Sequence, residues 1–166
     1  MSTTVFVAIG SNIEPQMRLQ QAARALKQHF AGARFSGCYR NRAFGFEGAD
    51  FLNAVAGFDT QLPIRELLLT LRGIEAQCGR GSADSKWQAR AMDLDLLLYG
   101  QAVERGADYS VPRPDLTRRA YMLGPLAELA PQWRYPPDGP TIGELWERFA
   151  RGEHPLHRDA LDLNAV

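Results

Sequence analysis

Two aspartates alternate with leucines in the segment MDLDLLLY at residues 92–99, and this pattern constrains the fold more than any other stretch of the chain. Residues two apart in a β-strand point to the same face, so Asp93 and Asp95 share one face with their Cα atoms about 6.5 to 7 Å apart. The opposite face is expected to carry Leu94, Leu96 and Leu98. Because an unpaired buried carboxylate is unfavourable, the acidic face must meet solvent or be paired with cations.

Other periodic segments predict three further strands and two helices. The strands are expected at residues 4–9, 34–40 and 51–59, where β-branched and aromatic residues gather. The first helix is expected after a cap at Ser11 or Asn12, with Pro15 in its first turn and Phe30 near its end. The second spans residues 63–79. The resulting order, β-α-β-β-α-β, is that of the ferredoxin-like fold, in which right-handed crossovers put both helices on one face of an antiparallel sheet.

The last third of the chain is predicted to cover the second face of that sheet. Helical periodicity occurs at residues 121–129, and a capping box of Thr141 and Glu144 begins another helix. We therefore expect an α+β fold: a ferredoxin-like antiparallel sheet with additional C-terminal helices over its second face. We expect one domain at residues 1–151, followed by a loosely ordered C-terminal tail at residues 152–166.

The charge balance argues against nucleic acid or an anionic membrane surface as a partner. The chain has 19 basic and 19 acidic residues, so no net field attracts a polyanion. A ferredoxin-like RNA-binding module, the alternative class, would need a basic sheet face with stacked aromatics. Without a signal peptide or a long apolar run, the chain is expected to be cytoplasmic. Its two cysteines, Cys38 and Cys78, lack metal-ligand spacing.

The acidic pair suggests a site for divalent metal ions. Mg²⁺ prefers carboxylate oxygen and keeps substrate phosphates among its ligands, and two such ions about 3.5 to 4 Å apart would fit between Asp93 and Asp95. Alternatively, the two acids face solvent and each pairs with an arginine. The preceding loop carries the cationic residues Arg80, Lys86 and Arg90 together with Trp87. Guanidinium groups match phosphate oxygens and a heterocycle can stack on an indole, so the segment favours a metal-bound polyphosphate.

Five segments in this order resemble the 6-hydroxymethyl-7,8-dihydropterin pyrophosphokinase family. They are AIGSN (8–12), FLNAV (51–55), GIEAQCGR (73–80), W-x-x-R-x-x-DLDLLLYG (87–100) and VPRPDLTRRAYMLGPLAELAP (111–131). The resemblance implies an enzyme that transfers the terminal diphosphate of ATP to a pterin hydroxymethyl group, with release of AMP, in folate biosynthesis. It also implies two Mg²⁺ ions, ATP as co-substrate, a monomer, and loops at 41–50 and 80–91 that close over the substrates.

The resemblance assigns a role to each matching residue. It makes Asp93 and Asp95 the ligands of both Mg²⁺ ions and places them with Arg80 and Arg90 in the catalytic set. The implied nucleotide contacts are Glu75, Trp87, Ser110, Arg113 and Arg119. The pterin is expected between the rings of Phe51 and Tyr121, with Asn53 reading its edge.

Several positions depart from the family pattern. Arg113 stands where relatives usually have His, Ser82 where they have Arg, and Ala89 where they have Pro. A Thr-Pro-Pro-like stretch is replaced by Asn41, Arg42 and Ala43. The alternative to a working pyrophosphokinase is therefore a divergent pterin- or nucleotide-binding paralogue with weak activity or an altered pterin substrate.

Overall fold

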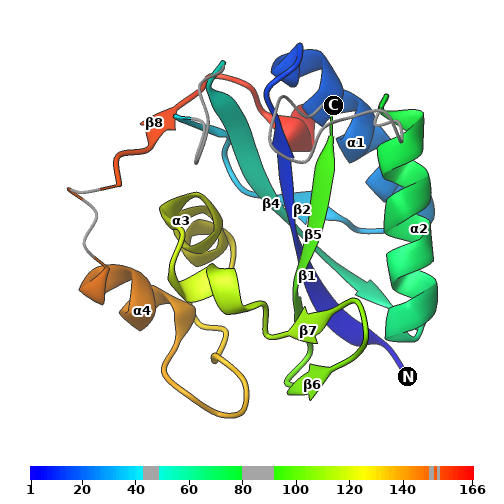
Figure 1. Ribbon diagram of the computed structural model, residues 1–166, viewed down its shortest axis with the longest axis vertical. Coiled ribbons are helices and arrows are strands. Elements are labelled where there is room, and N and C mark those ends of the chain that lie inside the picture. The colour runs from blue at the N-terminus through cyan, green and yellow to red at the C-terminus, as the bar shows by residue number, and fades with distance from the viewer. Residues whose placement is uncertain (43–48, 80–91, 150–151, 153) are drawn as a thin grey trace.

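A six-stranded antiparallel sheet forms the centre of the computed structural model, which describes residues 1–42, 49–79, 92–149, 152 and 154–166 (Figure 1). Its strand order is β5-β1-β4-β3-β8, and β2 also pairs with β4. The strands are β1 (Thr3–Ser11), β2 (Arg34–Phe35), β3 (Tyr39–Asn41), β4 (Phe51–Thr60), β5 (Asp93–Tyr99) and β8 (His157–Arg158). The predicted ferredoxin-like order, with β1 between β4 and β5, is confirmed.

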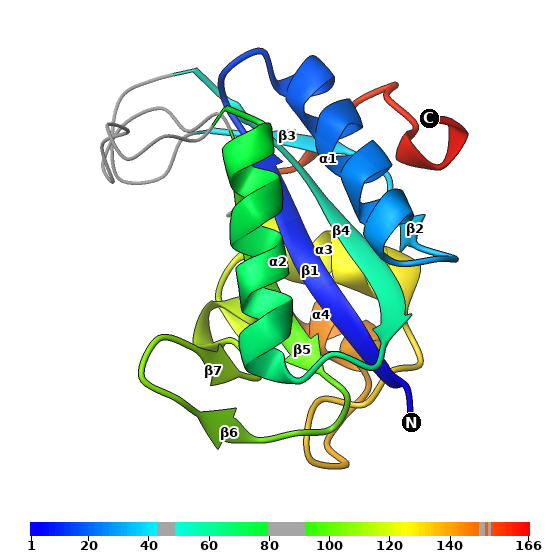
Figure 2. The same cartoon turned by 90° about the vertical axis from the view of Figure 1, so that its right-hand side faces the viewer.

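The two predicted helices lie on one face of the sheet, as expected. They are α1 (Pro15–His29) and α2 (Ile64–Gln77), and Figure 2 shows both in front of the strands. Val5, Val7 and Ile9 of β1 point into the core beneath them and are fully buried. Alternation along β1 therefore sends its other side chains to the opposite face.

That opposite face is covered by α3 (Ala120–Leu129), α4 (Ile142–Arg148) and the short η1 helix (Pro114–Thr117) (Figure 1). Phe6 and Val55 of the sheet are buried against this layer. The predicted capping box is present, since the Thr141 hydroxyl and the Glu144 carboxylate each accept from the other residue's backbone N–H. A small two-stranded sheet, β6 (Glu104–Arg105) with β7 (Ser110–Val111), leads into η1. No helix among the described residues is long and apolar enough to cross a membrane.

One β-bulge changes the predicted faces of β5. Val7 pairs with Leu96 but the adjacent Phe6 pairs with Leu98, so Leu97 is an extra residue in the ladder. As a result Leu98 lies in the core under α3, together with Leu97. The expectation that it shares the α1–α2 face with Leu94 and Leu96 is wrong, because a single inserted residue reverses the alternation beyond it.

Two predicted boundaries also differ from the structure. Helix α1 is preceded by Glu14 in the left-handed conformation without a side-chain cap, whereas Ser11 belongs to β1 and Asn12 donates to the Ala49 carbonyl oxygen. The strand expected at 34–40 is divided into β2 and β3. Between them the Ser36 hydroxyl accepts from the Val55 N–H and replaces a ladder bond.

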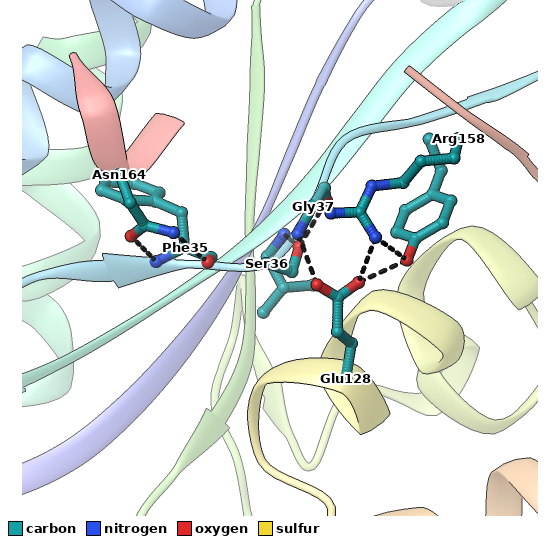
Figure 3. A network of polar contacts seen from close by, with 8 residues as sticks. Phe35, Ser36, Gly37, Glu128, Arg158 and Asn164 are labelled. Atoms are coloured by element: carbon teal, nitrogen blue, oxygen red, sulfur yellow. Dashed lines mark hydrogen bonds and ion pairs between the residues drawn. The ribbon is translucent and has the colours of Figure 1, made fainter. Parts of the chain in front are cut away.

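The C-terminal segment packs against the sheet instead of forming the loosely ordered tail expected from sequence. Strand β8 pairs with β3, and the Asn164 carboxamide bonds both the N–H and the carbonyl of Phe35, as a neighbouring strand would (Figure 3). Figure 3 also shows Glu128 of α3 accepting from the Gly37 N–H and facing Arg158. Leu163 is fully buried. Weak periodicity concealed this packing because the segment uses single anchors rather than an amphipathic helix.

Candidate functional site

The predicted acids and the predicted pterin-reading residue occupy one row across the sheet. Gly10 of β1 pairs with Asp93 on one side and with Asn53 of β4 on the other. Neighbouring strands are about 4.8 Å apart, so Asp93 and Asn53 stand roughly 10 Å from each other across Gly10. Because glycine has no side chain, the Asn53 carboxamide oxygen can lie over Gly10, on the same face of the sheet as the acids.

Asp95 is a largely buried acid within this site. Its side chain is 18% exposed. Its pKa is raised from 3.8 to about 7: burial is the largest cause, the charge of Asp93 adds to it, and the Arg113 guanidinium opposes both effects. In the alternative, both acids face solvent and each pairs with an arginine; Asp95 does not face solvent, but its ion pair with Arg113 is the arginine contact that this alternative expects. A buried acid beside a like charge is poised to accept a cation.

Arg113 provides a cationic group at this point. The Arg113 N–H donates to the Leu97 carbonyl oxygen at 2.9 Å, which fixes the loop after β7 against β5. Its Nη1 lies 3.6 Å from Oδ1 of Asp95. Its Nε is buried without a hydrogen-bond partner within the described residues. The residue that departs from the family pattern is thus in direct contact with a predicted metal ligand.

The donor set fits Mg²⁺. Asp93 and Asp95 offer hard carboxylate oxygens on one face, and Mg²⁺ is typically held by one or two carboxylates together with water and phosphate oxygen. Among the described residues no group of three or more His, Cys, Asp or Glu side chains could enclose a metal ion. A Mg²⁺ ion held by these two carboxylates would take its remaining ligands from water or from a bound substrate.

The predicted aromatic residues border the same face. Phe51 begins β4 two residues before Asn53 and is half-buried, so the two side chains point the same way. Tyr121 lies in the first turn of α3 and is half-buried. Burial raises the pKa of its hydroxyl, Arg119 lowers it, and Asp95 and Asp93 raise it. Tyr121 and Arg119 therefore lie within electrostatic reach of the acids.

Glu75, predicted as a nucleotide contact, bonds the backbone of β5 in the structure. This residue of α2 is buried, accepts from the Leu94 N–H at 2.7 Å and is paired with Arg72, whose guanidinium also donates to the Leu94 carbonyl oxygen. The pair thereby satisfies the outer edge of β5 between the two acids. Ser110 lies in β7, paired with Arg105. The nucleotide contacts predicted for Glu75 and Ser110 stay predictions.

Some predicted residues lie outside the described part of the chain. These are Arg80, Trp87 and Arg90, together with the departures at Ala43, Ser82 and Ala89 and most of the two loops expected to close.

Sequence reasoning missed three residues that shape the site: Gly10, Asn12 and Asn41. Asn41 accepts a hydrogen bond from the Nδ2 of Asn53. Asn12 holds the backbone just before β4. The AIGSN segment was a signal for Gly10 and Asn12, but their partners become visible only with the strand register.

Comparisons with known proteins establish the family of the chain and support its fold. The model of the family described as 7,8-dihydro-6-hydroxymethylpterin-pyrophosphokinase (HPPK) matches residues 6–131. The Synechocystis sp. 2-amino-4-hydroxy-6-hydroxymethyldihydropteridine pyrophosphokinase is 39% identical over 145 residues, covering 86% of this chain and 74% of the relative. The Pseudomonas aeruginosa protein of the same name is 37% identical over 149 residues, covering 87% and 91%.

Among solved structures, the chain is similar to Plasmodium falciparum HPPK-DHPS with pteroate, with a TM-score of 0.72 at 10% identity. The match covers 92% of this chain but only 45% of that one, so the chain spans less than half the length of these solved relatives. This likeness supports the fold. The family match and the curated relatives show that the chain belongs to the 7,8-dihydro-6-hydroxymethylpterin-pyrophosphokinase family.

Proposed function

We propose that this chain transfers the terminal diphosphate of ATP to 6-hydroxymethyl-7,8-dihydropterin, giving AMP and the pterin diphosphate used in folate biosynthesis. The observation that carries the proposal is the row of Asp93, Gly10 and Asn53 across the sheet. The acidic pair and the Asn53 amide lie on one face of the sheet, which supports a site where carboxylates hold metal-bound phosphates and the amide bonds a heterocycle. The phosphate donor and the hydroxymethyl acceptor would meet between these two groups.

Asp93 and Asp95 would hold two Mg²⁺ ions together with ATP phosphates, in the catalytic set with Arg80 and Arg90. When bound, the metal ions would neutralise phosphate charge. Arg113, already at 3.6 Å from Asp95, and Arg119 supply further positive charge. The remaining nucleotide contacts are proposed at Glu75, Trp87 and Ser110.

On the pterin side, Phe51 and Tyr121 would stack on the two faces of the bicyclic ring, and Asn53 would bond its polar edge. Such stacking and edge recognition fix the hydroxymethyl oxygen in line with the β-phosphorus of ATP. The new bond joins that oxygen to the β-phosphorus while the hydroxyl proton passes to solvent, the bond from the β-phosphorus to the α–β bridging oxygen breaks, and AMP leaves with that oxygen. Alignment and charge neutralisation carry most of the catalysis in such transfers.

The proposal extends to the oligomeric state, the class of substrate and the cellular location of the protein. We propose a monomer as the active form. The equal numbers of basic and acidic residues support small-molecule substrates rather than nucleic acid. We also propose a cytoplasmic location and a single catalytic domain that includes β8 and the C-terminal segment packed against the sheet.

A direct assay tests the proposal. The purified chain is incubated with MgCl₂, ATP and 6-hydroxymethyl-7,8-dihydropterin, and AMP and pterin diphosphate are separated by chromatography. We expect equimolar appearance of both products, dependent on the pterin. AMP formed without pterin diphosphate, or no AMP at all, would contradict the proposed function.

A further inference from the structure

The carboxamide of Asn53 is held from both sides by neighbouring strands. Toward β3, its Nδ2 donates to the Oδ1 of Asn41. Toward β1, its Oδ1 lies above Gly10, where a Cβ atom would come within 2.8 Å of that oxygen. Asn53 is 6% exposed. The amide group is therefore confined, with its nitrogen on the β3 side and its oxygen on the β1 side.

The orientation of Asn41 explains why Asn53 cannot simply reverse. The Nδ2 of Asn41 donates to the Arg42 carbonyl oxygen at 3.0 Å, which leaves its Oδ1 turned toward Asn53. In the β3–β4 register Tyr39 pairs with Asn53 and Asn41 with Phe51, so Asn41 is the diagonal neighbour of Asn53. Rotating the Asn53 amide by half a turn would bring two carbonyl oxygens together. That arrangement lacks a donor, so it is disfavoured.

From this geometry we infer that Asn41 is a specificity-determining residue, which fixes the Asn53 carboxamide so that a carbonyl oxygen faces the pterin position. The inference rests on the proposed function, in which Asn53 reads the ring edge. A fixed acceptor selects a ring that offers an N–H donor at this point, and we assign that donor to the 2-amino group of a 2-amino-4-oxo pterin. A 2,4-dioxo analogue presents an oxygen in place of the 2-amino group and leaves the acceptor unpaired.

Asn41 acts on Asn53 through a side-chain hydrogen bond between neighbouring strands. This side-chain contact sets the orientation of the Asn53 carboxamide. Its effect should accordingly be measurable as ring discrimination, separately from nucleotide binding and from folding.

Three variants test the inference. Asn41→Leu removes the acceptor at nearly constant volume, and Asn41→Asp keeps an oxygen that accepts from Asn53. Tyr39→Phe is the matched control on the same strand, because it removes only the hydroxyl bonded to Glu128. For each protein, the Kd of the pterin and of its 2,4-dioxo analogue is measured by fluorescence in the presence of Mg²⁺ and a non-hydrolysable ATP analogue. The Kd of the ATP analogue and the Tm are measured alongside.

We expect Asn41→Leu to weaken pterin binding about ten-fold and to reduce the preference for pterin over the dioxo ring by a similar factor. Asn41→Asp should recover part of both, and Tyr39→Phe should change neither by more than about two-fold. Unchanged pterin affinity and ring preference in Asn41→Leu would overturn the inference. So would a parallel loss of pterin and ATP-analogue binding with a lowered Tm, which would mark a structural role. Wild-type protein that binds no pterin would contradict the proposed function as well.

Discussion

At the scale of single residues, the raised pKa of Asp95 makes the free energy of unfolding depend on pH. Its folded-state pKa of about 7 lies above the ordinary 3.8, so the folded protein binds more protons than the unfolded chain between these values. The stability of the metal-free protein should therefore fall as pH rises through that window. Asp95→Asn removes the titrating group, so we expect the variant to be more stable than wild type at pH 8 and the difference to shrink toward pH 4.

Urea unfolding in EDTA at several pH values measures this difference. Glu147→Gln, at an exposed position, is the control for loss of an acid and should follow the wild-type profile. Asp95→Asn should also lose pterin diphosphate formation. An Asp95→Asn protein that is less stable than wild type at pH 8 would mean that Asp95 supports the apoprotein fold, contrary to its raised pKa.

Gly10 is the second residue with a specific expectation. Gly10→Ala would place a Cβ 2.8 Å from the Asn53 Oδ1, so the amide must move. We expect pterin affinity to fall about ten-fold, the scale of one hydrogen bond to a buried polar group. Fluorescence titration measures the effect. Gly73→Ala is the control, since a Cβ there meets nothing within 4 Å; equal pterin affinity in the two variants would show that Asn53 adapts freely.

These residues also show what sequence reasoning can and cannot reach. Alternation along one strand was enough to put Asp93 and Asp95 on one face, because that relation is local. Leu98 was misplaced because a bulge is a property of two paired strands. The roles of Gly10 and Asn41 depend on the register of β1, β3 and β4, and pairing between distant segments is not encoded in any one of them.

At the scale of elements, side chains form backbone hydrogen bonds with β5 and with β2 that a neighbouring strand would otherwise form. Glu75 and Arg72 bond the N–H and carbonyl of Leu94 on β5, and Asn164 bonds those of Phe35 on β2. These bonds satisfy backbone groups that an edge would otherwise expose to pairing with another chain. The same contact at Leu94 braces the strand between the two acids.

We expect Glu75→Leu to lower the free energy of unfolding by about 1 to 3 kcal/mol, because the Leu94 N–H loses its side-chain acceptor and Arg72 its carboxylate. Arg72→Leu should destabilise less, since Arg72 is 48% exposed and water can replace its contact. Urea denaturation of both variants compares them. If Arg72→Leu proved the more harmful change, the brace would depend on the guanidinium rather than on the buried carboxylate.

The C-terminal segment gives a second expectation at this scale. Leu163 is fully buried among residues of the α1–α2 core, so Leu163→Ala should destabilise the protein by about 2 to 5 kcal/mol. Val103→Ala trims a residue that is 62% exposed and is the control. Thermal and urea unfolding report the effect. Equal stability of the two variants would mean that the segment is loosely ordered, as the sequence led us to expect.

At the scale of the whole molecule, a chain without net charge must bind a highly charged substrate through local charges alone. The site contains the acids Asp93 and Asp95 as well as Arg113 and Arg119, so bare ATP meets attraction and repulsion together. Metal ions on the acids remove the repulsion. We therefore expect a non-hydrolysable ATP analogue to raise the Tm of wild-type protein strongly with Mg²⁺ and weakly in EDTA.

The variant with both Asp93→Asn and Asp95→Asn sharpens this expectation. Without the acids the arginines remain, so the analogue should raise the Tm by a similar amount with and without Mg²⁺, although the variant transfers no diphosphate. Thermal unfolding of both proteins under the four conditions measures the coupling between metal and nucleotide. Equal shifts for wild type in Mg²⁺ and EDTA would show that the acids do not oppose ATP, and their proposed role as metal ligands would fail with that result.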